Sequence, residues 1–191
     1  MLILNFDPFP ALMTERLELR CLENKDMHEI LMLRSDPRVL HYLCRPPETT
    51  LQQAQDFILK VKAFACSGEA ITWAISLRGN PCLIGTICFW NILKQNHRAE
   101  IGFAMNPAYQ GKGLMWEAVN QVVQYGFEVM RLHSIEAQVT PENIASVKLL
   151  ERNHFIREAW FKENIFYEGN YIDTAVYSLM RSGEYPPARV M

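Results

Sequence analysis

Two glycines give the segment Gln110-Gly111-Lys112-Gly113-Leu114-Met115 the composition of an anion-binding loop. A strand pattern precedes this segment and a helical pattern follows it, so the glycines lie at the start of a helix. Unpaired backbone N–H groups and the helix dipole attract anions there, and glycine lets that backbone approach a ligand closely. The segment therefore fits a pyrophosphate, to which Lys112 adds positive charge. A flexible turn between strand and helix is the alternative.

Two other phosphate-binding motifs do not fit the same segment. The third glycine of the dinucleotide fingerprint G-x-G-x-x-G falls at Trp116. The segment also lacks the G-x-x-x-x-G-K-[ST] pattern of nucleotide-hydrolysing phosphate loops. The anion would therefore belong to another class of ligand.

Glu100 is the first candidate for acid–base chemistry. It lies in a run in which large and small residues alternate, so that one face of a strand packs tightly and the other has room for a ligand. A carboxylate in such a position can act as a general base through water. The alternative is a structural carboxylate that pairs with Arg98, His97 or a neighbouring strand. The large face carries Ile101, Phe103 and Met105, and the other face carries Glu100, Gly102 and Ala104.

The elements that must position these groups follow from hydrophobic periodicity and from glycine, proline and capping residues. Apolar residues that alternate with polar ones predict strands, and apolar residues spaced three and four apart predict helices. Strands are predicted at 17–21, 71–77, 82–90, 99–105, 134–139, 156–167 and 171–180, and helices at 24–36, 49–68, 110–130 and 143–153.

Length and composition limit the possible classes of protein. The chain has 191 residues, is 49% hydrophobic and carries a net charge of −2, which predicts one domain over residues 1–191. The charge lacks the basic excess that nucleic-acid binding uses, so we expect no nucleic-acid partner. No window approaches the ~18 to 20 apolar residues of a membrane span, so we expect no membrane partner and a cytoplasmic protein.

The cysteines and the large aromatic residues have plain structural interpretations. The five cysteines are odd in number and form no C-x-x-C pair, so neither a disulfide framework nor a metal site is expected. Cys82 and Cys88 lie in apolar strand runs, where burial would make the thiols inert as nucleophiles. The aromatic residues Trp73, Phe89 and Trp90 are expected in the core.

Four segments in order along the chain resemble the GNAT superfamily of acetyl-CoA-dependent N-acetyltransferases. The stretch from Glu100 through Gly113 is similar to its signature segment, whose motif is [Q/R]-x-x-G-x-[G/A]. Residues 14–20 look like the family's opening strand, and residues 143–155 look like its segment N-x-x-S…E-x-x-G-F. Residues 169–179 are similar to the closing hairpin of the RimJ/RimL branch, which acetylates protein N-terminal α-amines, notably on ribosomal proteins.

The resemblance implies an α/β fold, a mixed, twisted, seven-stranded sheet with helices on both faces. Its central strands would splay apart to form the cleft for acetyl-CoA. The exposed backbone of the first of these strands would pair with the pantetheine amides, and Asn143 would contact the pantetheine arm. The cofactor-binding residues that it implies are Phe103, Ala104, Met105, Gln110, Gly111, Lys112, Gly113, Leu114, Met115 and Asn143.

The resemblance also implies direct acetyl transfer in a ternary complex of acetyl-CoA and an amine. Glu100 would be the base. The superfamily often uses a tyrosine as the acid, but its position reads Leu150 here, so Ser146 is the candidate that protonates the departing thiolate. Tyr167 is the reserve candidate.

Three matters stay open at this point. The acceptor is a protein N-terminal α-amine, or else a small-molecule amine such as a polyamine, amino sugar or antibiotic. A non-catalytic acyl-CoA sensor is the other alternative, since Met115 stands where the signature has Gly or Ala and His154 stands where the family commonly has Gly. Finally, a homodimer is a candidate assembly.

Overall fold

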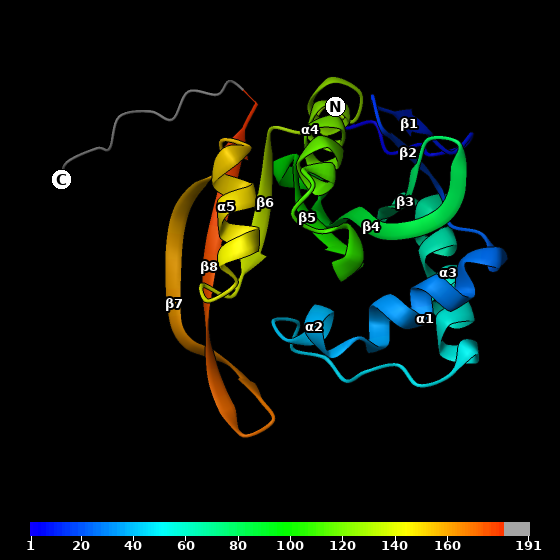
Figure 1. Ribbon diagram of the computed structural model, residues 1–191. Helices are drawn as coiled ribbons and strands as arrows, with labels where there is room; N and C mark the ends of the chain where they lie inside the picture. Colours follow the sequence, from blue (N-terminus) through cyan, green and yellow to red (C-terminus); the bar gives the residue numbers. More distant parts are fainter. Residues whose placement is uncertain (182–191) are drawn as a thin grey trace.

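The structure is a computed structural model, and it describes residues 1–181 of the chain. In these residues eight strands form one mixed sheet in the order β1-β2-β3-β4-β5-β6-β8-β7 (Figure 1). Every neighbouring pair is antiparallel except β5 and β6, which are parallel. The strands are β1 (Leu12–Met13), β2 (Leu17–Cys21), β3 (Ile71–Leu77), β4 (Asn80–Leu93), β5 (Arg98–Met105), β6 (Ser134–Val139), β7 (Ile156–Tyr167) and β8 (Asn170–Met180).

Capping residues stand at the ends of the helices α3 and α5. Thr50 caps α3 through a capping box with Gln53, and Gly68 ends it in the left-handed conformation at φ +68°. Asn143 caps α5 by accepting a hydrogen bond from the backbone N–H of Ser146. The helices are α1 (Met27–Ser35), α2 (Pro37–Leu40), α3 (Leu51–Ser67), α4 (Leu114–Glu128) and α5 (Ile144–Arg152).

Helices cover both faces of the sheet, as predicted. The main core lies between the sheet and the helices α4 and α5, and it contains the fully buried Trp73 and Phe89. A second core lies on the opposite face, where Ile30 of α1 and Ile58 of α3 pack against Ala74.

The parallel pair at the centre of the sheet separates after a short contact. Within the described chain, β5 and β6 pair only from Arg98 and Ser134 to Glu100 and Glu136. Beyond that point β5 continues to Met105 against β4, and β6 continues to Val139 against β8. The inner edges of both strands are therefore free to hydrogen-bond an extended ligand. This splay confirms the predicted opening between the two strands.

The observed fold differs from the predicted one in three details. The sheet has eight strands rather than seven, because the two-residue β1 pairs with β2 at Leu19 and Glu18. The predicted helix over 24–36 is α1 alone, preceded by one 3-10 turn, and Pro37 then begins the separate helix α2. The predicted helix from 110 starts only at Leu114, because Gly111 and Gly113 have φ of +74°.

The predicted single domain includes residues 182–191, which lie outside the described residues. In the described part of the chain, no helix is long and apolar enough to cross a bilayer. Over the same residues, no three His, Cys, Asp or Glu side chains are grouped so as to hold a metal ion.

Candidate active site

The glycine loop lies between the end of β5 and the start of α4. Gly111 and Gly113 both adopt φ of +74°, a conformation that glycine tolerates and most residues do not. Gly113 is also the N-cap of α4, so the first N–H groups of that helix have no partner within it. The loop therefore presents backbone donors at the positive end of a helix dipole, which suits a phosphate group.

The polar side chains of the loop hold its shape. The Gln110 side-chain nitrogen donates to the backbone oxygen of Met105 at 2.9 Å, which ties the loop to the last residue of β5. Lys112 Nζ donates to the backbone oxygen of Ala108 at 2.8 Å and lies 5.4 Å from the Tyr109 ring centroid. The charge of Lys112 is thus held at the rim of the loop.

The two departures from the family signature have clear structural outcomes. Met115 is half-buried and packs against the main core, so its side chain is accommodated without filling the loop. His154 has φ of +64°, a left-handed conformation that glycine adopts more easily than other residues. Its backbone N–H donates to the oxygen of Glu151 at 3.0 Å, which closes the turn after α5. Such a conformation costs a non-glycine residue energy but is tolerated in a closed turn.

Glu100 lies at the base of the splay, at the last position where β5 and β6 pair. Its side chain is buried, with 6% exposure. Burial raises the pKa of Glu100 to about 7; a hydrogen bond with the Asn91 side chain opposes this shift, and the charge of Glu136 adds to it. A carboxyl group with a pKa near neutrality can both accept and release a proton at physiological pH.

The alternative ion pair between Glu100 and Arg98 is not what the structure shows. Arg98 Nη2 instead hydrogen-bonds Glu136, and it lies 3.9 Å from a Glu158 oxygen. The charge of Arg98 is therefore directed toward β6 and β7 rather than toward Glu100. Glu100 keeps a raised pKa for this reason as well as through its burial.

On the face of the sheet that carries Glu100, an aromatic side chain is exposed. Trp90 lies opposite Glu100 in the β4–β5 register and is 49% exposed, so its predicted place in the core is wrong. Phe89 faces the main core, and the next residue of a strand points to the other side. A Cβ on Gly102 would lie 3.5 Å from Trp90 Nε1. The absence of a side chain at Gly102 therefore lets the Trp90 indole lie close to the β5 backbone.

Three of the cysteines are poor nucleophiles. Burial raises the pKa of Cys88 to about 12, and the neighbouring Glu100 adds to that shift. Burial also raises the pKa of Cys44. Cys82 is exposed rather than buried, which corrects its predicted position, but its pKa is also raised. A thiol with a raised pKa holds little thiolate at neutral pH, which makes an acyl-cysteine intermediate unfavourable.

Asn143 and Ser146 meet in the first turn of α5. The Asn143 side-chain oxygen accepts the Ser146 backbone N–H at 3.2 Å, so its amide nitrogen keeps its donors for another partner. Ser146 is half-buried. The structure thus assigns the capping role to Asn143, and the role of the Ser146 hydroxyl stays a prediction.

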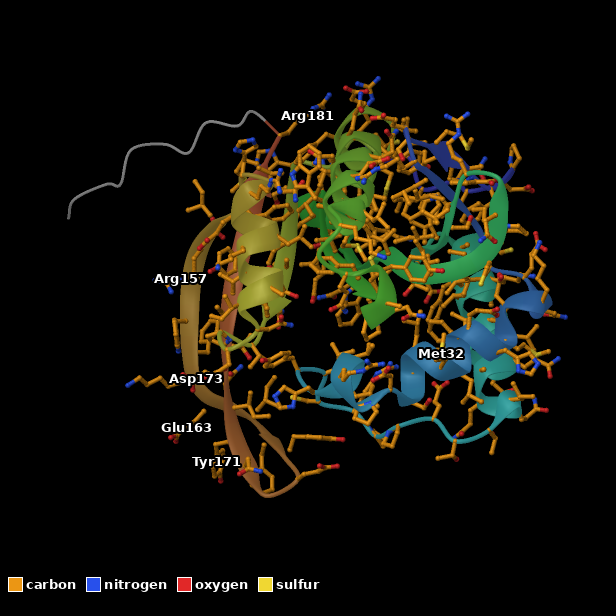
Figure 2. All side chains as sticks on the ribbon, in the orientation of Figure 1. Met32, Arg157, Glu163, Tyr171, Asp173 and Arg181 are labelled. Carbon is orange, nitrogen blue, oxygen red and sulfur yellow. The ribbon has the colours of Figure 1, made fainter. Side chains whose placement is uncertain are left out.

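Tyr167 lines a small cavity to which no residue of the glycine loop contributes. The cavity has a volume of about 50 Å³ and lies between the segment after α2, the start of the β6–α5 connection and the β7–β8 hairpin. By contrast, Tyr171 is 66% exposed and points away from α2 (Figure 2). The cavity is lined by Leu40, His41, Tyr42, Leu43, Cys44, Thr140, Tyr167 and Ile172.

The ten predicted cofactor residues come from β5, the glycine loop with the first turn of α4, and the N-cap of α5, whereas the three catalytic candidates come from β5, α5 and β7. Sequence reasoning missed Asn91 and Glu136, which face Glu100, and the contact of Arg16 with Glu117. Nothing in the sequence pattern pointed to Asn91. Its distinguishing feature is a φ of +46°, which cannot be read from a sequence. The Arg16–Glu117 contact joins residues 101 positions apart.

Comparison with known proteins decides the family. Residues 16–156 match the family described as Acetyltransferase (GNAT) domain. This span covers well over half of the chain and includes the splayed strands, the glycine loop and α5. The chain belongs to the GNAT acetyltransferase family.

Several N-acetyltransferases are similar to this GNAT acetyltransferase over nearly their whole length. An uncharacterized N-acetyltransferase, p20, of Bacillus licheniformis is 36% identical over 90% of this chain and 96% of its own. The spermidine N(1)-acetyltransferase of Vibrio cholerae is 27% identical over 89% of this chain and 96% of its own. The ribosomal protein uS5-alanine N-acetyltransferase of Escherichia coli is 25% identical over 95% of this chain and 96% of its own.

Solved structures share the fold. A GNAT-family acetyltransferase from Bacillus anthracis has a TM-score of 0.81 and 29% identity, covering 91% of this chain and 99% of its own. RimL, the ribosomal L7/L12 α-N-protein acetyltransferase, in complex with coenzyme A, has a TM-score of 0.83 and 20% identity, covering 92% and 100%. The family match and the N-acetyltransferase relatives show that the chain is an acyltransferase, which favours an enzyme over a non-catalytic sensor.

Proposed function

We propose that this GNAT enzyme acetylates a protein N-terminal α-amine by direct transfer in a ternary complex. The observation that carries the proposal is the buried Glu100 at the base of the splay, with a pKa of about 7. An N-terminal α-ammonium has a pKa of about 7.7–8.0, whereas an alkylammonium such as lysine has one of about 10.4. Proton transfer to Glu100 is therefore uphill by about one pKa unit for an α-amine and by more than about three for an alkylamine.

The mechanism uses one proton acceptor and one proton donor. Glu100 accepts the proton of the α-ammonium through water, and the neutral amine then attacks the thioester carbon. A C–N bond forms, the C–S bond breaks, and the electron pair of that bond leaves with the sulfur as the CoA thiolate. Ser146, or Tyr167 in reserve, donates the proton that converts the thiolate to the thiol. The second proton, which the attacking nitrogen loses as the amide forms, returns to that hydroxyl through water. Glu100 finally releases its proton to water.

The cofactor is held by backbone more than by side chains. The free inner edge of β5 at Phe103, Ala104 and Met105 hydrogen-bonds the pantetheine amides. The loop from Gln110 to Met115 binds the pyrophosphate through N–H groups at the start of α4. Asn143 donates from its amide nitrogen to the pantetheine arm. This division leaves the β7–β8 hairpin and the segment after α2 to select the acceptor.

An amine panel with labelled acetyl-CoA tests the acceptor. The panel pairs a peptide with a free N-terminus and no lysine against the same peptide with a blocked N-terminus and one internal lysine. Spermidine and an amino sugar complete it. We expect label on the free N-terminus, located by mass spectrometry, at a kcat/KM at least about tenfold above the others. A preference for the lysine peptide would contradict the proposal.

A polyamine is the second candidate acceptor. The relative named spermidine N(1)-acetyltransferase is as similar to this chain as the relative that acetylates ribosomal protein uS5, at 27% and 25% identity. Spermidine acetylation faster than peptide acetylation in the same panel would establish this candidate in place of the first.

A further inference from the structure

Arg16 lies just before β2 and reaches the glycine loop, although nearly one hundred residues separate them in the sequence. Its Nη1 donates to the backbone oxygen of Lys112 at 3.0 Å. Its Nη2 lies 3.6 Å from the point that a Cβ on Gly113 would occupy. Its Nε donates to Glu117 Oε2 at 2.7 Å. One guanidinium thus contacts both the loop and the first turn of α4.

The Glu117 carboxylate fixes this guanidinium from the other side. Its Oε1 accepts the backbone N–H of Arg16 at 2.8 Å and the hydroxyl of Thr14. Burial acts to raise the pKa of Glu117, but the hydrogen bonds from Thr14 and Arg16 together lower it below the ordinary value. Glu117 is therefore ionised and held by the turn that connects β1 and β2.

The hydrogen bond from Arg16 to the Lys112 carbonyl sets the direction of the Gly113 N–H. The peptide that joins Lys112 to Gly113 is planar and trans, so its C=O and N–H groups point in opposite directions. Because Arg16 holds the carbonyl, the Gly113 N–H points away from the guanidinium. The glycines on both sides of Lys112 have left-handed φ and little steric restraint, so this hydrogen bond restricts a loop that is otherwise free to rotate.

The contact with Glu117 has an electrostatic effect. A carboxylate in the first turn of a helix interacts with the same positive dipole end that a phosphate would use. The Arg16 guanidinium neutralises this carboxylate where it lies. Without Arg16, a bare negative charge would stand beside the expected pyrophosphate and weaken its binding.

We infer that Arg16 is a positioning residue for the pyrophosphate of CoA, acting through the Lys112–Gly113 peptide and through Glu117. This inference rests on the proposed role of the glycine loop in binding the cosubstrate. It adds the turn between β1 and β2 to the cofactor site. Arg16 lies outside the glycine-loop motif, which spans Gln110 to Met115.

Two variants and a matched control test the inference by calorimetry. Arg16→Gln removes the charge and the fork of donors, and Arg16→Lys keeps the charge but cannot bridge Lys112 and Glu117 in the same way. Arg78→Gln is the control, because Arg78 hydrogen-bonds the backbone of the same turn at Glu15 and is exposed. We expect both Arg16 variants to bind CoA and dephospho-CoA at least about tenfold more weakly, with Arg78→Gln unchanged.

Kinetics separate positioning from a general structural role. At saturating acetyl-CoA, kcat of the Arg16 variants should stay within about twofold of the wild type, because the chemistry lies at Glu100. With S-acetylpantetheine, which lacks the pyrophosphate, kcat/KM of the variants should equal that of the wild type. An equal loss with S-acetylpantetheine would mean a general structural defect and would overturn the inference.

Three other outcomes also overturn it. Wild-type affinity for CoA in a folded Arg16→Gln or Arg16→Lys protein would show that the contact does not matter. A loss with CoA but not with dephospho-CoA would assign Arg16 to direct contact with the 3′-phosphate. Failure of the wild-type enzyme itself to bind CoA would refute the proposed function, and the inference with it.

Discussion

At the scale of single residues, the site depends on how β4 and β6 tune Glu100. Burial raises its pKa, the Asn91 side chain stabilises the charged form by a hydrogen bond, and the negative charge of Glu136 disfavours that form. Arg98 reduces this repulsion by pairing with Glu136. Asn91 has φ of +46° at a bulge in β4, so a strained backbone places its amide toward Glu100.

This arrangement predicts opposite pH shifts for two variants. Asn91→Gly keeps the positive φ without strain but removes the amide, so the pKa of Glu100 should rise. Glu136→Gln removes a negative charge, so the pKa of Glu100 should fall. Because Glu100 acts in its ionised form, the rising limb of kcat/KM against pH should move up in the first variant and down in the second. Shifts in the same direction, or none, would contradict the role given to these two residues.

Ser146 gives a prediction about thiolate release. If its hydroxyl donates a proton to the departing sulfur, Ser146→Ala should lower kcat by roughly tenfold to a hundredfold. A thiol with a pKa near about 8.5 is already a tolerable leaving group, which limits the loss. The Kd for acetyl-CoA, measured by calorimetry, should stay constant. A weaker Kd with unchanged kcat would instead mean that the hydroxyl holds the pantetheine arm, and no change in either would direct attention to Tyr167→Phe.

At the scale of elements, the glycine loop and α4 act as one unit. Gly113 is the N-cap of α4 with φ of +74°, and a side chain there would meet Arg16. Gly113→Val should strain the backbone and crowd the approach of the pyrophosphate. The affinity for acetyl-CoA should fall at least about tenfold, which corresponds to ~1.4 kcal/mol.

A second glycine supplies the matched control for this prediction. Gly79 has φ of +77° in the turn between β3 and β4, and no atom lies within 4 Å of the point where its Cβ would be. Gly79→Val therefore introduces the same kind of backbone strain away from the loop. Calorimetry should give wild-type affinity for Gly79→Val. Equal losses in the two variants would assign the effect to stability rather than to the loop.

At the scale of the whole molecule, α4 must lie very close to the sheet for the loop to reach the splay. A Cβ on Gly126 would come within 2.9 Å of the Phe89 ring and 3.1 Å of Leu132, and Phe89 is fully buried. Gly126→Val should therefore overpack the core and destabilise the protein by roughly 1–3 kcal/mol. Denaturant unfolding measures this change. A variant as stable as the wild type would mean that α4 can move outward without cost.

Most of the fold could be predicted from the sequence, because long elements repeat their pattern several times. The strand at 134–139 has the predicted bounds, and the helix at 49–68 agrees with α3 to within two residues at its start. By contrast, β1 is too short to display any periodicity. Pro37 ends α1 as predicted, but it also begins α2, since proline suits the first position of a helix and Asp36 caps it.

The site was predictable only where its residues are neighbours in the sequence. The glycine loop and the Asn143–Ser146 turn are local patterns, so their types and spacing indicate their chemistry. Asn91, Glu136 and Arg16 come from other elements, and only the pairing of β4, β5 and β6 and the packing of α4 bring them to the site. A homodimer and the acceptor stay predictions for the same reason, since both depend on contacts with a second molecule.

The pH dependence of Glu100→Gln tests the central claim most directly. With a peptide acceptor, wild-type kcat/KM should rise with a midpoint near the Glu100 pKa of about 7. Glu100→Gln should be slower by roughly a hundredfold at neutral pH. Its remaining activity should rise only as the acceptor amine itself loses its proton, at about pH 7.7–8.0. A variant with the rate and midpoint of the wild type would show that the amine arrives already neutral and that Glu100 is not the base.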